Sequence, residues 1–335
     1  MKILLDKGAN PNGDLACPLP LCLAVVRGHV GVVEALLRSG ADPNHTGVFS
    51  GQWNATWPSP PLILAVDAGR LDIVNALLRY MADPSICHGL LTHAVAFDRV
   101  DIFSALMPYH EALADLPTVA FTAVILGRRE ILDILLESAM REHVDSKTFG
   151  SGQTLLMIAA RAGKPEVVSL LLRRGANANG TDTDGDTPLI HAMSGATDSA
   201  LVIDVVYVLL VYRADATMTN LAGRSPLAFA AEIENVPVCR LLRMCGADPR
   251  RPDVNSCSPV DIARRKNNAH IVSVLENALF EQSDPTCAVC MDALSSSDTR
   301  TIHTCGHRFH EACIALWTHK CPTCSVRIPW GPAAR

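Results

Sequence analysis

Six cysteines and two histidines crowd into one short stretch near the carboxyl end of the chain. Their order and spacing read Cys287-x2-Cys290-x14-Cys305-x-His307-x2-His310-x2-Cys313-x7-Cys321-x2-Cys324. Thiolate sulfurs and imidazole nitrogens form disulfides, carry redox chemistry or bind metal ions. Eight such donors are enough for two closed four-coordinate metal shells. The spacing therefore raises a choice among three kinds of chemistry.

The start of the chain bears on that choice. The segment MKILLDKGANPNG lacks the apolar core and cleavage site of a signal peptide, so we expect an intracellular protein with reduced cysteines. Zinc suits mixed thiolate and imidazole donors, and a C-x2-C pair places two sulfurs on one metal. An iron–sulfur cluster more usually takes four cysteines from one group, and a redox C-x-x-C needs a surrounding βαβ pattern, which is absent. The spacing favours zinc.

The ligand order Cys-Cys-Cys-His-His-Cys-Cys-Cys resembles the RING-H2 finger of ubiquitin ligases. The cross-brace of that family implies two Zn²⁺ ions. It implies a first zinc on Cys287, Cys290, His310 and Cys313, and a second on Cys305, His307, Cys321 and Cys324. A domain of this size has little apolar core, so two metals shared between its lobes would stabilise it.

The resemblance also implies a surface for a ubiquitin-conjugating enzyme (E2). Val289, Trp317 and Pro322 match the positions that form the shallow docking groove of the family, although Trp317 has core packing as an alternative role. A RING has no nucleophile, so its implied role is to orient the thioester of the charged E2 for attack by a substrate lysine. The sequence departs from active members at Ser325, where Arg or Lys is common, and the helix that carries Trp317 is shortened.

The rest of the chain repeats itself. Matching phrases begin at Leu19, Pro60, Thr154, Thr187 and Ser225. In most of them a Pro opens a helix, directly after Thr or Ser at Thr187-Pro188 and Ser225-Pro226. Alanines follow, and a second helix then brings apolar residues onto one face. The phrase at Thr154 lacks this Pro, and the phrase at Thr187 matches over its first helix alone. A glycine in the left-handed conformation is the typical end of such a second helix.

A period of roughly 33 residues with a T-P-L-H-x-A core resembles the ankyrin repeat, over about Met1 to Leu279. The resemblance implies a mainly α solenoid that binds other proteins through hairpin tips and its inner helical face. We expect about seven full repeats, some degenerate, after a half repeat that is either truncated or a natural cap. The expected second-helix ends are Gly8, Gly40, Met81, Gly175, Arg213 and Gly246.

Chemically capable side chains are scattered through the array. We expect hydrogen-bonded structural roles for the single histidines His29, His93, His191 and His270. We expect buried thiols at Cys17, Cys22, Cys87, Cys239, Cys245 and Cys257. We expect helix-start carboxylates at Glu34, Asp72 and Glu166. An insertion over 47–59 carries Trp53 and Trp57, which either anchor a partner or cover the flank of the solenoid.

Composition excludes two classes of partner. The net charge is −5 and no basic face is visible, so we expect no nucleic acid. The longest apolar run, ALVIDVVYVLLVY, is too short for a bilayer and carries Asp204, so we expect no membrane span. Aromatic residues make up only 5% of the chain, which favours a core of aliphatic residues and alanine. We expect a cytoplasmic or nuclear protein.

The predicted organisation is a repeat array over 1–279, a linker over 280–286 and a RING-H2 zinc finger over 287–328. The predicted function is that of a RING-type E3 ubiquitin transferase, which binds a protein substrate through its array and an E2 through its finger. The alternative is a non-catalytic scaffold whose finger is a zinc-stabilised docking or dimerisation module, consistent with Ser325.

Overall fold

The computed structural model describes most of the repeat array and two short strands. The described residues are 2–13, 19–46, 59–112, 116–138, 140–141, 143–148, 150–195, 199–276, 299–301 and 308–310. The chain divides into two compact units, which are Met1–Glu142 (unit 1) and His143–Arg335 (unit 2).

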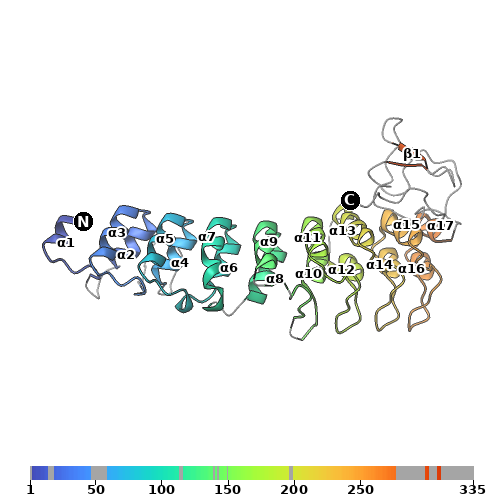
Figure 1. Ribbon diagram of the computed structural model, residues 1–335. Coiled ribbons are helices and arrows are strands. Elements are labelled where there is room, and N and C mark those ends of the chain that lie inside the picture. Colours follow the sequence, from blue (N-terminus) through green and yellow to red (C-terminus); the bar gives the residue numbers. More distant parts are fainter. Residues whose placement is uncertain are drawn as a thin grey trace. The chain divides into compact units, whose positions relative to one another are not determined.

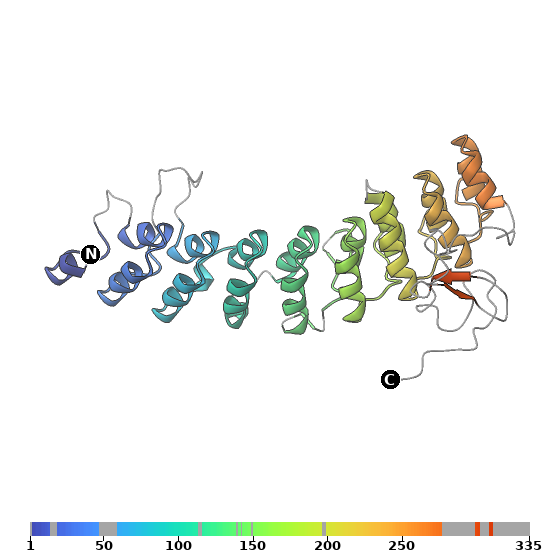
Figure 2. The same ribbon diagram turned by 90° about the horizontal axis from the view of Figure 1, so that it is seen from above.

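Unit 1 consists of stacked pairs of short helices. The first helices of the pairs are α2 (Pro20–Val26), α4 (Pro61–Asp67), α6 (Leu90–Ala96) and α8 (Leu116–Leu126). The second helices are α3 (Val30–Arg38), α5 (Leu71–Arg79), α7 (Val100–Leu106) and α9 (Arg129–Glu137), with α1 (Lys2–Asp6), η1 (Pro84–Ile86) and η2 (Met107–Ala112) outside the pairs. First helices pack against first helices and second against second, which gives two parallel rows (Figures 1 and 2).

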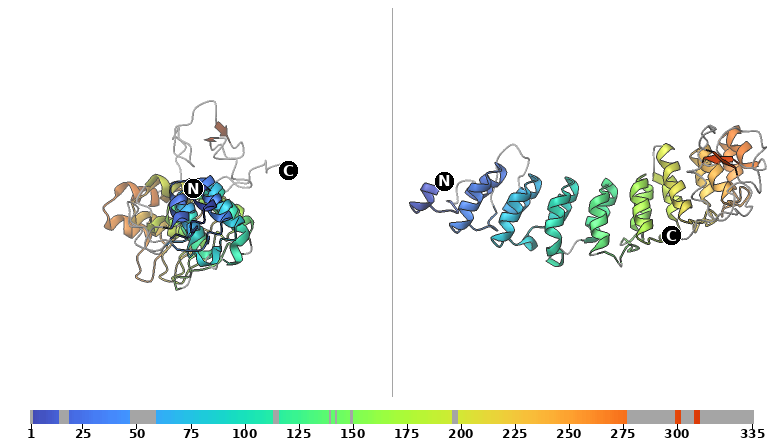
Figure 3. Two further views of the ribbon diagram at one scale, coloured as in Figure 1. Left: turned by 90° about the vertical axis from the view of Figure 1, so that its left-hand side faces the viewer. Right: turned by 45° about the horizontal axis from the view of Figure 1, so that its top comes forward.

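Unit 2 repeats this arrangement. Its first helices are α10 (Leu155–Arg161), α12 (Pro188–Gly195), α14 (Pro226–Glu232) and α16 (Pro259–Arg265). Its second helices are α11 (Pro165–Arg173), α13 (Ser199–Val211), α15 (Val236–Met244) and α17 (Ala269–Glu276). Figure 3 shows from further sides that the helices within each unit lie next to one another. The loops that precede α12, α14 and α16, at 182–187, 220–225 and 253–258, are called fingers below.

Side-chain caps start several first helices where the sequence predicts them. Thr187 Oγ1 accepts from the backbone N–H of Ile190, and Ser225 Oγ accepts from that of Ala228. Ser258 caps α16 in the same way, and a Pro follows each of these three caps at the first helical position. Each cap satisfies an amide that the helix cannot pair itself, and Pro presets the backbone for the first turn.

Left-handed residues end the second helices. The six predicted ends all have positive φ, with 85° at Gly8, 87° at Gly40, 67° at Met81, 92° at Gly175, 66° at Arg213 and 92° at Gly246. At two of them the residue is not glycine, although a side chain makes this conformation costly. The repeat geometry therefore overrides local preference there.

A buried alanine lies at the same place in every first helix. These residues, each at most 5% exposed, are Ala24, Ala65, Ala94, Ala123, Ala159, Ala192, Ala230 and Ala263. Because alanine ends at Cβ, it permits close approach of the adjacent first helix. Leucine, valine and isoleucine fill the remaining core, as the low aromatic content predicts.

Side-chain oxygens join successive repeats. Asn12 Oδ1 accepts from the backbone N–H of Asp42 at 2.8 Å, and Asn44 Oδ1 from that of Asp83 at 2.8 Å. In unit 2, Asp145 Oδ1 accepts from Asn177 N at 2.9 Å, and Asn179 Oδ1 from Asp215 N at 2.7 Å. Each of these bonds satisfies an amide of one repeat with an acceptor from its neighbour. We call this series the junction ladder.

The fingers of unit 2 form a second series of bonds. Leu221 N donates to Asp184 O at 3.0 Å, and Val254 N donates to Ala222 O at 3.1 Å. Thr183 N donates to the carbonyl of the loop before α10 in the same manner. Adjacent fingers are therefore held edge to edge by their backbones.

These features confirm the predicted mainly α solenoid, with two differences of detail. Eight helix pairs follow α1 in the described residues, where about seven full repeats were expected. Asp72 and Glu166 lie in first turns as predicted, but Glu34 lies within α3 and pairs with Arg38. Trp53 and Trp57 fall outside the described residues.

Glycine substitutions test the contact between fingers. Gly185 has φ 78°, and a Cβ there would lie 2.9 Å from the backbone nitrogen of Leu221. Gly175 has φ 92° with nothing within 4 Å. We expect Gly175→Ala to cost about 1–2 kcal/mol through backbone strain alone. Gly185→Ala should cost about 1–3 kcal/mol more, because the neighbouring finger must move.

Urea unfolding of the two variants and the wild-type chain measures this difference. Equal free energies of unfolding for the two variants would contradict the tight contact between the α12 and α14 fingers.

Candidate functional site

The predicted zinc ladder lies almost entirely outside the described residues. Of its eight ligands only the backbone of His310 is described, as the last residue of strand β2 (Arg308–His310). The other predicted ligands, Cys287, Cys290, Cys305, His307, Cys313, Cys321 and Cys324, lie outside, as do the predicted E2-docking residues Val289, Trp317 and Pro322. These assignments remain predictions, and so do the boundaries of the linker and finger.

A two-stranded antiparallel pair is described within this stretch. Strand β1 (Thr299–Thr301) pairs with β2 so that Thr299 faces His310 and Thr301 faces Arg308. Two predicted ligands, Cys305 and His307, fall in the sequence between the two strands. The pairing brings the backbone at His310 beside the start of β1.

The donor set itself fits zinc. Six thiols and two imidazoles within 38 residues match the sulfur and nitrogen ligands of tetrahedral zinc sites, and the number matches two such sites. Carboxylates, which favour magnesium or calcium, are not needed to complete either shell.

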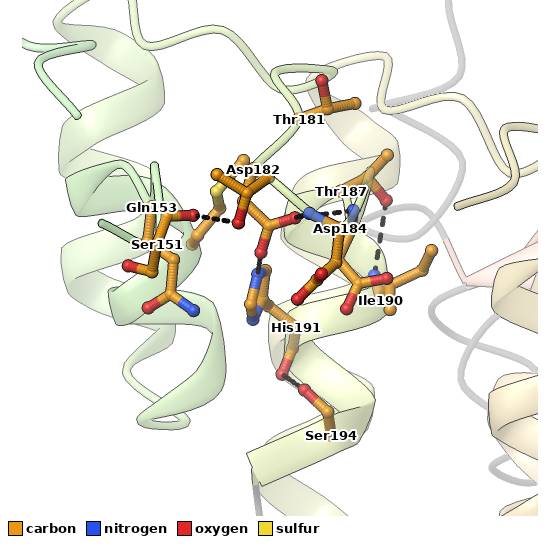
Figure 4. Close-up of polar contacts among 12 residues, drawn as sticks. Ser151, Gln153, Thr181, Asp182, Asp184, Thr187, Ile190, His191 and Ser194 are labelled. Carbon is orange, nitrogen blue, oxygen red and sulfur yellow. Dashed lines mark hydrogen bonds and ion pairs between the residues drawn. The ribbon is translucent and has the colours of Figure 1, made fainter. Parts of the chain in front are cut away.

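Within the described residues, a second polar cluster lies where the α12 finger meets its helix (Figure 4). His191 Nε2 on α12 lies 2.8 Å from Asp182 Oδ2, and these side chains are 6% and 3% exposed. The other carboxylate oxygen, Oδ1, accepts from the backbone N–H of Asp184 at 3.0 Å and of Asp186 at 2.8 Å. Asp186 in turn accepts from the amide of Asn220 at 2.8 Å.

The side chains of this cluster are of the types that bind metals, but their hydrogen bonds hold the α12 finger against its helix. We call Asp182 and His191 with these bonds the clamp. Ligand atoms of Asp182, Asp186 and His191 all lie within 4.8 Å of one another. Both oxygens of Asp182 already have donors, so an incoming cation would have to displace hydrogen bonds that close the finger. The sequence prediction of a hydrogen-bonded structural role for His191 is confirmed, whereas its partner Asp182 was not predicted.

His93 is a second confirmed example. Its Nδ1 lies 2.7 Å from Asp67 Oδ1 of the preceding repeat. This hydrogen bond, and then the negative charge of Asp67, raise the pKa of His93 above its ordinary value, against an opposing effect of burial. The pair is partly exposed on the first-helix row of unit 1.

Three of the scattered cysteines are buried in the core, as predicted. Cys22, Cys87 and Cys239 are buried, whereas Cys245 and Cys257 are only partly buried and Cys17 lies outside the described residues. Burial raises the pKa of Cys87 to about 11 and that of Cys239 to about 12. Both thiols are therefore protonated at neutral pH, unlike the thiolates that a metal requires.

A polar hollow of about 310 Å³ lies between loops of unit 2. Its one amine, Lys147 Nζ, donates to the backbone oxygen of Thr181 at 2.7 Å. Asp145 and Asn177 at its wall belong to the junction ladder. Its polar groups thus support the fold and offer no paired acid and base.

Comparison with known families agrees with this division of the chain. The family described as "Ankyrin repeat" matches residues 19–48 and 60–89, and "Ankyrin repeats (3 copies)" matches 120–203. The family described as "RING-like zinc finger" matches 286–314. That range holds six of the eight predicted zinc ligands and ends before Cys321 and Cys324.

The chain is an ankyrin-repeat protein with a RING-like zinc finger. It is 32% identical over 40% of its length to the mouse B-cell lymphoma 3 protein homolog. It is 28% identical over 54% of its length to the E3 ubiquitin-protein ligase KEG of Arabidopsis thaliana, and 38% identical over 28% to the probable E3 ubiquitin-protein ligase XBOS33 of rice.

The matched stretches span 30%, 10% and 18% of those three proteins. Among the described helices of this ankyrin-repeat protein, none is long and apolar enough to cross a membrane.

Removing the buried carboxylate tests the clamp. Asp182→Ala leaves two backbone amides and one imidazole nitrogen without their partner, so we expect a loss of about 2–4 kcal/mol in the free energy of unfolding. Asp184→Ala, two residues away on the exposed tip, is the matched control and should change it by less than about 0.5 kcal/mol. Thermal and urea unfolding measure both, and similar losses in the two variants would rule out a clamp.

The pKa of His93 gives a pH test. Since folding raises this pKa, the pair stabilises the fold fully below the unfolded value of about 6.5, and the contribution is lost as pH rises through the folded value. We expect NMR titration to place the His93 pKa above 6.5, and Asp67→Asn to lower it. Asp72→Asn, which removes a carboxylate from the next helix, is the control. An unchanged pKa in Asp67→Asn would refute the assigned cause.

Proposed function

We propose that this chain is a RING-type E3 ubiquitin ligase whose ankyrin array captures a protein substrate. The observation that carries the proposal is the RING-like match at 286–314, with its regularly spaced cysteines and histidines, on the same chain as the repeat array. Two proteins that share sequence with this chain bear the name E3 ubiquitin-protein ligase, one of them as probable.

Two zinc ions would have a structural role in the finger. Cys287, Cys290, His310 and Cys313 would hold one, and Cys305, His307, Cys321 and Cys324 the other. Zinc supplies the cross-links that a domain with so little apolar core lacks. We therefore assign no step of the transfer reaction to the metal.

The residues of the finger would act by positioning. Val289, Trp317 and Pro322 would form the docking surface for a charged E2, where the large ring of Trp317 offers the most apolar area. The reaction is attack of a lysine amine on the E2 thioester, which forms an isopeptide bond and releases the E2 thiol. The chain needs no nucleophile of its own, because holding thioester and amine together raises their effective concentration.

The array would supply the second half of that arrangement. Within each unit the stacked first helices offer an extended surface for a protein partner, and unit 2 adds its fingers. A substrate held there and an E2 held on the same chain meet at the high effective concentration of linked binding sites. We place this activity in the cytoplasm or nucleus, where the thiols of the finger stay reduced.

Ser325 favours a second candidate. Active RING fingers commonly carry Arg or Lys at this position, next to both E2 and ubiquitin, and serine cannot make the same charge-assisted contacts. The chain would then be a scaffold whose zinc finger docks or dimerises without accelerating transfer.

Discharge of ubiquitin from charged E2 enzymes onto free lysine separates the two candidates. We expect the zinc-loaded chain to accelerate discharge from at least one member of an E2 panel, and Val289→Ala to reduce the acceleration by about tenfold or more. Ser325→Arg should raise it if the missing charge limits the rate. A chain that binds two zinc ions yet accelerates no E2 would support the scaffold.

Zinc content is an independent prediction. Mass spectrometry of the native chain should show two zinc ions, and Cys305→Ser should lose the second, because three ligands bind zinc far more weakly than four. Cys239→Ser, at a buried thiol with a pKa of about 12, is the matched control and should keep both. One ion in the native chain would rule out the assignment of two sites.

A further inference from the structure

Unit 1 exposes large apolar side chains on neighbouring first helices. Phe97, the residue after α6, is 51% exposed, and Ile125 and Leu126 at the end of α8 are 55% and 42% exposed. The helices α6 and α8 pack side by side. Phe97 and Leu126 occupy equivalent places, three residues after the buried Ala94 and Ala123. We call Phe97, Ile125 and Leu126 the apolar patch.

The composition of α8 makes this exposure unusual. Its sequence, LPTVAFTAVIL, is apolar on every side, a pattern typical of a helix that is covered all round. Only Val119, Ala120, Ala123 and Val124 are buried. Contiguous exposed apolar residues commonly mark a surface that binds another molecule.

An arginine row runs beside the patch. Arg70 and Arg128 each precede a second helix and reach back over the turn of the preceding repeat. Arg70 Nη2 donates to Gly28 O at 3.1 Å and pairs with Asp72. Arg128 Nη2 donates to Ala96 O at 3.2 Å and pairs with Asp98 at 3.0 Å. Both guanidinium charges are thus compensated by a carboxylate of the array.

Arg99 is the middle member of the row and differs from the other two. Its side chain lies over Gly69, where an added Cβ would be 2.5 Å from Arg99 Cζ. Within the described ranges no carboxylate or carbonyl pairs with its guanidinium. Its Nε, like that of Arg128, is buried without a hydrogen-bond partner. Asp101, the counterpart of Asp72, accepts instead from Ile102 N at 2.8 Å.

Two acidic groups near the patch already have partners. Asp67 bonds to His93, and Asp98 pairs with Arg128. Arg99 therefore has capacity for a further partner, and it lies only two residues from Phe97 on the same turn. Apolar area and an unpaired guanidinium together suit a ligand with apolar anchors and a carboxylate.

We propose that the apolar patch and Arg99 form a docking site for an acidic amphipathic segment of a partner protein. Apolar side chains of the segment would cover Phe97, Ile125 and Leu126, and an Asp or Glu would pair with Arg99. This proposal rests on the proposed function, since the partner is what the ligase would modify.

Synthetic peptides test the chemistry directly. The probe is a short fluorescein-labelled helix with leucines at i, i+3, i+4 and i+7 and glutamates beside them. Two companions carry glutamine or lysine in place of every glutamate. We expect fluorescence anisotropy with the full chain to show binding of the glutamate peptide, weaker by about tenfold with glutamine and weaker still with lysine.

Variants of the chain locate the binding. Phe97→Ser and Leu126→Ser should weaken the glutamate and glutamine peptides alike. Arg99→Gln should make these two peptides bind equally, whereas Arg99→Lys should restore part of the preference because it restores the charge. Leu221→Ser, at a side chain 78% exposed on the α14 finger of unit 2, is the matched control and should change nothing. Circular dichroism confirms that each variant is folded.

Three results would overturn the proposal. The first is an absence of peptide binding, and the second is binding that ignores the patch variants. The third is a concentration-dependent dimer, seen by sedimentation, that Leu126→Ser abolishes, since a second copy would then be the occupant. Discharge of ubiquitin from E2 onto free lysine needs no protein substrate. If the chain accelerates this discharge but peptide binding does not depend on the patch, the docking site is refuted and the ligase proposal is not.

Discussion

Several repeats of this chain depend on hydrogen bonds that reach into the next one. An asparagine or aspartate oxygen of one repeat accepts a backbone amide of its neighbour, as Asn44 does from Asp83 and Asn179 from Asp215. A buried amide without a partner costs as much as a lost hydrogen bond, so a repeat on its own is incomplete. Stability is therefore built from neighbour to neighbour, which is the general physics of solenoids.

This dependence decides which polar residues are available for function. Asp182 and His191 resemble a metal site in composition, yet their hydrogen bonds already hold the α12 finger closed. Arg70 and Arg128 likewise donate hydrogen bonds to the turns of the preceding repeats. What remains for a partner is the set that the fold does not use, above all the exposed apolar residues of α8 and the guanidinium of Arg99. In the predicted zinc finger, metal ligation would supply the stability that a domain with little apolar core needs.

Much of the array could be predicted because its signals are local. The Ser and Thr caps, the apolar faces and even the left-handed ends at Met81 and Arg213 follow from residues close in sequence. The described residues hold eight helix pairs after α1, one more than the approximate count from sequence. The partner of His191 and the lack of one for Arg99 in the described residues were not predictable, because they depend on how one loop folds over another. The zinc ligands were predicted from spacing alone, and their assignment to two sites stays a prediction.

We propose that one chain joins a recognition array that folds without metal to a zinc-dependent finger that recruits an E2. A chelator titration tests it most directly, with the helical circular-dichroism signal and the discharge of charged E2 onto lysine followed in the same samples. The account predicts that discharge falls as zinc is removed and that thermal melting of the helices is unchanged. Discharge that survives complete removal of zinc, or helices that melt together with its loss, would contradict the account.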